Sequence, residues 1–201
     1  MSRASRSAAA TAYQLKVTLR GSMPPIWRRL QVRGDSTLAQ LHHVLQEAMG
    51  WHELHLHEFE VGGVSYGEPD DEPDPFGFAE TLSDRAVKLS RLGLRERSTF
   101  RYEYDFGDGW WHTLLVEKVL PVETGVAYPR CLTGRRACPP EDCGGMWAYT
   151  RLLEIVHDPA HPEHEEWRDW LGRPLTPEAF DLDATNRRLA WLTEHGPPVR
   201  G

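Results

Sequence analysis

The chain has 201 residues, of which 40% are apolar and 26% charged, and a formal net charge of −7. This length and composition fit one globular domain with a substantial core, and no apolar run reaches the about 18 residues of a membrane-spanning helix. The acidic balance disfavours broad nucleic-acid binding, which depends on Lys and Arg neutralising phosphates, and the Ser/Ala/Arg-rich N-terminus lacks the apolar stretch of a secretory signal. We therefore expect a cytoplasmic protein with no membrane partner and with nucleic acid as a disfavoured partner.

The first elements form a strand pair and a helix. Residues 13–20 and 26–32 are rich in β-forming side chains and flank a Gly-Ser-Met-Pro-Pro turn, which is typical of antiparallel strands. Asp35, Ser36 and Thr37 are candidate helix caps. Apolar side chains at helical spacing then predict a helix from Leu38 that ends at Gly50.

The chain next returns to extended structure. Residues 54–61 predict a third strand, and Gly62-Gly63 predicts a tight turn before a return strand at 64–66. The resulting β-β-α-β order predicts an α+β fold with a β-grasp-like core. The acidic, proline-rich segment 68–75 predicts an exposed loop, and weak periodicity over 83–94 predicts a short helix.

A long β-hairpin is the clearest feature of the sequence. Residues 99–105 and 110–120 alternate strongly, and the Asp-Gly between them is a hairpin signal. After Pro121 the pattern changes to an irregular, cysteine-containing segment at 122–145. Helices are then predicted at 146–157, 162–171 and 183–195.

These elements predict one domain over residues 13–195 between two short tails. The domain would have a sheet-rich half and a loop and helical half. The expected boundaries are 1–12 for the first tail, 13–120 and 121–195 for the two halves, and 196–201 for the second tail.

The hairpin carries the first candidate site. If Asp108-Gly109 forms a two-residue turn, Asp105 lies across from His112; if 106–109 form the loop, Glu103 does. In either register a carboxylate lies beside the imidazole of His112. The carboxylate would raise the pKa of this histidine, which suits a general base or a metal ligand. A cross-strand salt bridge is the alternative.

The three cysteines form the second candidate site. An odd number of cysteines argues against a disulfide framework and for a reducing compartment. Cys131, Cys138 and Cys143 together with His112 would supply the four ligands of a tetrahedral zinc site. Small buried cysteines, or a redox pair of Cys138 and Cys143, are the alternatives.

The segment that contains the cysteines also contains two carboxylates. Glu141 and Asp142 follow two prolines and precede Gly144-Gly145, at the expected start of a helix whose N–H groups attract a carboxylate or an anion. If this loop packs on the hairpin, a group of acids and one histidine converges that could hold Mg²⁺ or Mn²⁺ and hydrolyse a phosphoester. These candidate catalytic residues are Asp105, Asp108, His112, Glu141 and Asp142.

Two further patterns concern histidines and arginines. The stretch from His52 to His57 does not match H-E-x-x-H, because position 56 is leucine; on a strand, His55 and His57 are expected as half-buried, hydrogen-bonded histidines. Arg28 and Arg29 follow a tryptophan on the second strand and are candidate anion-binding residues. Because neighbouring strand residues face opposite sides, at most one of the two arginines faces a given site.

Five blocks of the sequence occur in an order that is familiar: Pro25–Arg29, Ala48–Trp51, His55–Phe59, Tyr104–Asp108 with His112, and Cys138–Gly145. Together they resemble the signature of the plasmid pRiA4b ORF-3-like family, over about residues 13–192. The resemblance implies a compact α+β domain found on plasmids, near transposons and in chromosomes, some of whose members carry a resolvase-like label. The residues do not support a resolvase, because the recombinase arrangements of arginine with histidine, or of an N-terminal serine, are missing from the sequence.

Three functions therefore stay open. The first is a binding or regulatory module associated with mobile elements. The second is a metal-dependent hydrolase that acts on a phosphoester or nucleic acid, with Mg²⁺ or Mn²⁺ as cofactor. The third is a structural zinc protein, which is compatible with either of the others.

Overall fold

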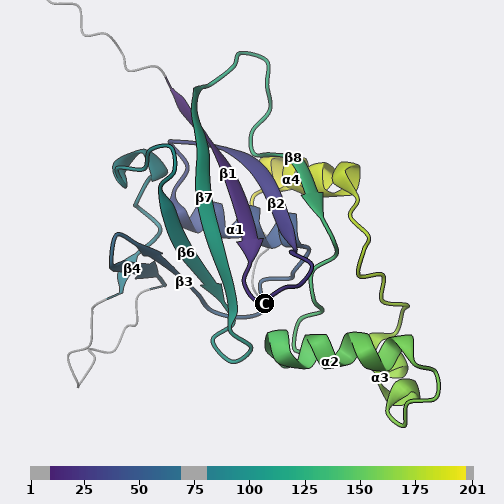
Figure 1. Cartoon of the computed structure of the whole chain (residues 1–201). Coiled ribbons are helices and arrows are strands. Elements are labelled where there is room, and N and C mark those ends of the chain that lie inside the picture. Colours follow the sequence, from purple (N-terminus) through teal and green to yellow (C-terminus); the bar gives the residue numbers. More distant parts are fainter. Residues whose placement is uncertain (1–9, 69–80, 198–201) are drawn as a thin grey trace, which may run out of the picture.

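The computed structural model describes residues 10–68 and 81–197 and shows an α+β protein built on one eight-stranded sheet (Figure 1). The strand order is β5-β4-β3-β6-β7-β1-β2-β8, and only the β4–β5 pair is parallel. The strands are β1 (Thr11–Leu19), β2 (Trp27–Arg33), β3 (His57–Val61), β4 (Val64–Gly67), β5 (Leu82–Ser83), β6 (Thr99–Tyr104), β7 (Trp110–Pro121) and β8 (Arg130–Arg135). The helices are α1 (Leu38–Met49), α2 (Gly145–His157), α3 (His164–Leu171) and α4 (Leu182–His195).

Helix α1 covers one face of the sheet, and its ends are set by local chemistry (Figure 1). Thr37 accepts a hydrogen bond from the Gln40 backbone while the Gln40 side chain accepts one from Thr37, a capping box that satisfies two otherwise unpaired N–H groups. Gly50 ends the helix in the left-handed conformation at φ 92°. The apolar stripe expected from the sequence, which includes Leu38, Leu41 and Leu45, is fully buried.

Helix α4 lies beside α1 and is tied to the edge strand β8 (Figure 1). The Asn186 side chain accepts a hydrogen bond from the Cys131 N–H at 2.8 Å and donates one to the Cys131 carbonyl at 2.9 Å. This side chain therefore extends the backbone ladder of β8 onto the helix, and it joins the C-terminal half of the chain to the sheet.

Helices α2 and α3 pack against each other at one end of the sheet, close to the β6–β7 turn (Figure 1). Gly144 caps α2, and its N–H donates to the Asp108 carboxylate at 3.1 Å. A carboxylate therefore occupies the positive end of this helix, as the sequence predicted.

Several expectations were wrong in detail. Strand β3 begins at His57 rather than at residue 54. The helix predicted over 83–94 is only a short 3-10 turn at Leu89–Arg91, because its apolar residues pack against the core without a repeating helical stripe. The segment 122–145 contains the edge strand β8, which its glycine and proline content concealed.

The β-β-α-β order is present, but a β-grasp-like core is not confirmed. The β6–β7 hairpin lies between β3 and β1 in the sheet, so β3 is not a neighbour of the β1–β2 pair. The acidic loop predicted at 68–75 and the tails predicted at 1–12 and 196–201 lie largely outside the described residues. Among the helices of the described chain, none is long and apolar enough to cross a membrane.

The close approach of α2 to the hairpin predicts a strict requirement for glycine at position 145. Gly145 has φ 77°, and a Cβ there would overlap with the Asp108 carbonyl oxygen. Gly145→Ala should therefore lower the free energy of unfolding by about 2 kcal/mol more than the matched Gly125→Ala. Gly125 has φ 81° with nothing within 4 Å of its added Cβ, so it reports the backbone cost alone. Equal losses in urea unfolding would contradict the close packing.

Candidate functional site

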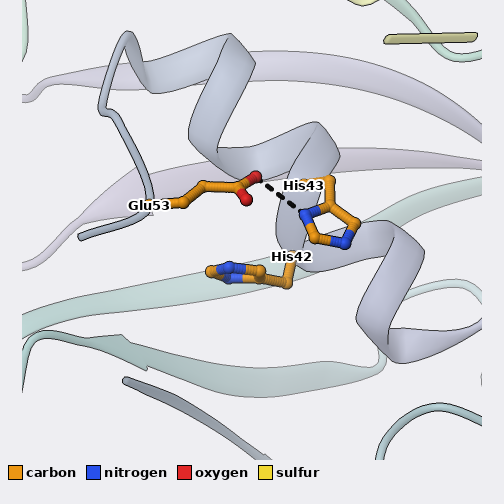
Figure 2. Close-up of side chains that lie close together, drawn as sticks. All are labelled: His42, His43 and Glu53. Atoms are coloured by element: carbon orange, nitrogen blue, oxygen red, sulfur yellow. Dashed lines mark hydrogen bonds and ion pairs between the residues drawn. The ribbon is translucent and has the colours of Figure 1, made fainter. Parts of the chain in front are cut away.

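Two histidines of helix α1 and a glutamate lie close together beside the helix (Figure 2). His42 and His43 are consecutive residues of α1, and Glu53 comes from the segment that follows the helix. Each offers one potential ligand atom, and these three atoms lie within 4.8 Å of one another. We call His42, His43 and Glu53 the histidine cluster.

The helix and its end position these side chains. His42 falls on the buried stripe of α1 and is 1% exposed, whereas His43 lies at the edge of that stripe and is half-buried. The turn at Gly50 sends the chain back along the helix, and Glu53 takes a left-handed conformation at φ 59°. Its N–H donates to the Gln46 side chain at 3.2 Å, which fixes the carboxylate against α1.

Each member of the cluster has a defined partner. His43 Nδ1 lies 2.7 Å from Glu53 Oε1. His42 Nδ1 lies 2.7 Å from the Tyr102 hydroxyl, which also accepts a hydrogen bond from the Gln46 amide at 2.9 Å. The tautomer in which His42 Nδ1 donates to Tyr102 presents the Nε2 lone pair to a metal, the arrangement common for metal-binding histidines.

A second polar pair lies directly behind the cluster. The ring of His57, on β3, stacks on His42 with centroids 3.6 Å apart and planes 7° from parallel. His57 Nε2 lies 2.9 Å from Asp84 Oδ2, and both side chains are buried. The sequence predicted a hydrogen-bonded histidine at His57, and the structure adds the aspartate and the stacked neighbour.

This region contains buried polar atoms that the protein leaves unsatisfied. Glu53 Oε2, Asp84 Oδ1 and His57 Nδ1 have no hydrogen-bond partner among the described residues. A buried polar atom without a partner costs about 1–3 kcal/mol, and more when the group is charged. The same side chains line a cavity of about 220 Å³. A cation in this cavity would satisfy atoms that the fold otherwise buries at a cost.

The carboxylates predicted to converge do so in part, around a different histidine. Asp142 Oδ1 lies 2.9 Å from His55 Nε2, and Asp105 Oδ2 lies 3.6 Å from the same atom. The cysteine-containing loop therefore does pack on the hairpin, with Asp108 also bound to Gly144. His55, Asp105 and Asp142 form a second group of three potential ligand atoms within 4.8 Å, with Asp142 exposed.

Glu141 is engaged separately from this group. It accepts a hydrogen bond from the Tyr104 hydroxyl at 2.5 Å and one from the His52 N–H at 2.9 Å. Burial and then the Glu141 carboxylate raise the pKa of Tyr104, so the phenol stays protonated and donates. Glu141 therefore connects the cysteine-containing loop to Tyr104 of β6.

His112 lies apart from every one of these carboxylates. In the observed register Tyr102 pairs with His112 and Tyr104 with Trp110, which differs from both predicted registers. Asp105 turns in the left-handed conformation at φ 58° and its carboxylate accepts the Gly107 and Asp108 N–H groups. The resulting loop over 105–109 shifts the pairing, so neither Asp105 nor Glu103 lies across from His112.

The four predicted zinc ligands are not brought together. The Cys131 thiol donates to the Thr133 carbonyl, and the Cys138 sulfur contacts Arg28 and Met49. None of the groups of three or more potential ligand atoms within 4.8 Å in the described chain contains a cysteine or His112. Burial raises the pKa of all three thiols, that of Cys143 to about 12, so they stay protonated at neutral pH.

Arg28 and Arg29 face opposite sides of β2, as the alternation of a strand requires. Arg29 is half-buried and forms two hydrogen bonds with the Glu117 carboxylate, at 2.6 and 2.8 Å. Arg28 is 3% exposed and points to the other side, toward the end of α1. Arg29 therefore forms an ion pair with Glu117 beside a separate hollow, whereas Arg28 lines the cavity at the end of α1.

The sequence patterns do not indicate a site at His42, His43 or Glu53. The available signal was a His-His pair on the predicted helix, followed by a glutamate just beyond Gly50. That signal is weak, because only the left-handed turns at Gly50 and Glu53 bring the carboxylate back to the helix.

Comparisons with known proteins cover most of the chain. The family model described as plasmid pRiA4b ORF-3-like protein matches residues 11–184. An uncharacterized protein y4hQ from Sinorhizobium fredii is 40% identical over 163 residues, which are 81% of this chain and 82% of that protein. The crystal structure of a protein of unknown function, MM3350, from Methanosarcina mazei Go1 is similar with a TM-score of 0.79 and 38% identity. That similarity covers 88% of this chain and 97% of the other.

The burial of His112 predicts an acid-sensitive fold. Burial lowers the pKa of His112 to about 3, and the nearby backbone groups of Trp110 and Tyr102 offset this only in part, since neither ring nitrogen has a well-formed hydrogen bond among the described residues. Between about pH 6.5 and 3 the unfolded chain binds a proton that the folded chain does not, so stability falls as pH falls, by about 1.4 kcal/mol per unit.

His112→Leu should remove this contribution. From pH 7 to pH 5, the wild-type protein should lose about 2 kcal/mol more than the variant in urea unfolding. His157→Gln, at an exposed position, is the control and should behave as wild type. Equal losses in wild type and His112→Leu would show that His112 is not the group responsible.

Proposed function

The chain belongs to the plasmid pRiA4b ORF-3-like family, and we propose that this protein binds a divalent transition-metal ion at His42, His43 and Glu53. The observation that carries the proposal is the combination of three converging ligand atoms with buried polar atoms left unsatisfied around one cavity. A hydrophobic core gains nothing from that combination, whereas a metal ion would complete it.

The donor set indicates which metals fit. Two imidazoles and one carboxylate suit Zn²⁺ and Fe²⁺ better than Mg²⁺ or Ca²⁺, which prefer oxygen ligands. Ligand atoms bound to one zinc ion each lie about 2.0–2.2 Å from it, so small rotations of the three side chains would bring them to bonding distance. The contacts of His42 with Tyr102 and of Glu53 with Gln46 are the kind of outer interactions that orient metal ligands.

Three protein ligands favour a catalytic over a structural metal. Structural zinc sites use four protein ligands, whereas catalytic sites keep one position for water or substrate. The cavity of about 220 Å³ beside the cluster has room for a water and a small substrate group. A bound ion would lower the pKa of that water and so supply a nucleophile. This supports a metal-dependent hydrolase that acts on a phosphoester.

Other locations for a metal are less well supported. The hairpin group of His55, Asp105 and Asp142 is a candidate for Mg²⁺ or Mn²⁺, but Asp142 is exposed and Asp105 is used by its own turn. A structural zinc at Cys131, Cys138, Cys143 and His112 would require these residues to move together. The candidate catalytic roles of Asp108 and Glu141 compete with the structural hydrogen bonds that both already make.

The cellular setting is also a proposal. The three free cysteines favour a reducing compartment such as the cytoplasm. The net charge of −7 disfavours nucleic acid as the main partner, although a regulatory role beside mobile elements is compatible with the metal site.

Metal content tests the proposal directly. Protein purified without a histidine tag and dialysed against Zn²⁺ should hold one zinc per chain by elemental mass spectrometry. Glu53→Gln, which keeps the side-chain shape but removes the charge, should lower the zinc content at least tenfold. The variant must retain the wild-type circular dichroism spectrum for this comparison.

Two matched variants distinguish the alternatives. Asp105→Asn and Cys138→Ser should keep the full zinc content, because neither residue belongs to the histidine cluster. Loss of zinc in Asp105→Asn with retention in Glu53→Gln would move the site to the hairpin. Loss in Cys138→Ser would restore the cysteine site, and zinc-free wild-type protein would refute all three.

A further inference from the structure

A larger cavity, of about 650 Å³, lies at the other end of α1. It is enclosed by the segment after α1, the proline-rich segment 137–142 and the connection between α3 and α4. Its size is within the range of about 300–1,000 Å³ that is usual for small-molecule sites. Its apolar wall includes Trp51, Pro139, Trp170, Leu175 and Phe180.

Arg28 brings a buried positive charge to this cavity. Its guanidinium donates to the carbonyls of Ala48, Trp27 and Arg135, at 2.9, 2.9 and 3.0 Å, and contacts the Cys138 sulfur at 3.5 Å. Burial raises the pKa of the Cys138 thiol, which therefore stays neutral. None of these partners carries a full negative charge, and no carboxylate forms an ion pair with Arg28 in the described part of the chain.

The carboxylates in the cavity wall are already engaged elsewhere. Both oxygens of Glu141 accept hydrogen bonds, from Tyr104 and from the His52 N–H. Asp142 pairs with His55, and Asp181 caps α4 through the Ala184 N–H. The lining thus holds three arginines and three carboxylates, and Arg28 is the buried charge among them for which the described residues supply no carboxylate partner.

Two more arginines line the same space. Arg188 donates to the Glu47 carbonyl at 3.0 Å and lies 3.5 Å from the Glu47 carboxylate, so its charge is partly balanced. Arg173 is exposed at the rim. Phe180 covers the Arg28 guanidinium at 4.4 Å, and its ring therefore forms an aromatic surface beside the charge.

From these observations we propose that the cavity binds a small organic anion. A carboxylate or phosphate monoester group would lie toward Arg28, with Arg173 assisting at the rim, and the body of the ligand would lie along Trp170 and Phe180. The Nε and Nη1 groups of Arg28 donate to backbone carbonyls, whereas its Nη2 makes a contact of 3.5 Å with Cys138 Sγ and keeps an N–H that can donate to an oxyanion. Hydrogen bonds between a guanidinium and a carboxylate or phosphate are stronger than neutral ones, because both partners are charged. This site does not depend on the metal proposed at His42, His43 and Glu53.

Small compounds that share an aromatic ring but differ in charge test this proposal. Benzoate and phenyl phosphate should bind at least ten times more tightly than benzylamine or benzyl alcohol, measured by two-dimensional NMR titration of the full chain. Comparing the affinities for benzoate and for phenyl phosphate also shows which oxyanion the cavity prefers. Binding of benzylamine as tight as that of both anions, or no binding of either anion, would overturn the proposal.

The location is tested with a variant that fills the cavity and keeps every charge. Arg28 also joins α1 to β2 and β8, so its own substitution threatens folding. Ala179→Trp, at an exposed position of the lining, should weaken binding of the tighter anion at least tenfold. Ala190→Trp, exposed on α4 outside the lining, is the matched control and should bind as wild type. Unchanged affinity in Ala179→Trp would place the anion elsewhere and contradict the assignment.

A second pair of variants tests the charge at the rim. Arg173→Gln should weaken anion binding severalfold without changing the weak affinity for benzyl alcohol. Arg95→Gln, at an exposed arginine outside the cavity lining, should have no effect. An equal effect of the two substitutions would show that only the overall charge matters.

Discussion

The packing of α1 on the sheet imposes the constraint on which both proposed sites depend. This packing buries three imidazoles, of His42, His43 and His57, and two carboxylates, of Glu53 and Asp84, in one place. The ion-pair partners of both carboxylates, within the described residues, are histidines rather than arginines or lysines. Such an interior is stable only if protons or a metal ion balance its charge. A divalent ion held by His42, His43 and Glu53 would balance part of this charge.

The short segment after α1 connects the sites. Its left-handed turns send Glu53 toward the histidine cluster, whereas Trp51, His52 and Leu54 line the larger cavity. His55, one residue further, meets the hairpin carboxylates Asp105 and Asp142. The proposed metal centre and the proposed anion cavity therefore lie on two sides of the same segment.

The sequence was sufficient for several of the regular elements. The helical stripe from Leu38 to Gly50 and the hairpin strands follow from local patterns, and both are present. A carboxylate at the start of α2 was expected as well, but the sequence left open whether that loop packs on the hairpin, where Asp108 supplies it. The hairpin register was wrong because Asp105 forms its own side-chain turn, a preference that Asp-Gly alone does not reveal. That turn removed His112 from the predicted site.

The histidine cluster could not be found from spacing alone. His42 and His43 are adjacent, and adjacent helical residues normally point in different directions. Their convergence with Glu53 depends on a non-glycine residue in a left-handed conformation, which the sequence does not indicate. The cavity beside Arg28 could not be found from spacing either. Its wall combines the end of α1 with residues of α3, of α4 and of the connection between them.

Anomalous X-ray diffraction from crystals of the zinc-loaded protein, with data collected on both sides of the zinc absorption edge, tests the proposed metal site most directly. We expect one peak bonded to His42, His43 and Glu53, at about 2.0–2.2 Å from each ligand atom, and no peak at this position in Glu53→Gln crystals. A peak at the cysteines or at His55, Asp105 and Asp142, with none at the histidine cluster, would contradict this expectation.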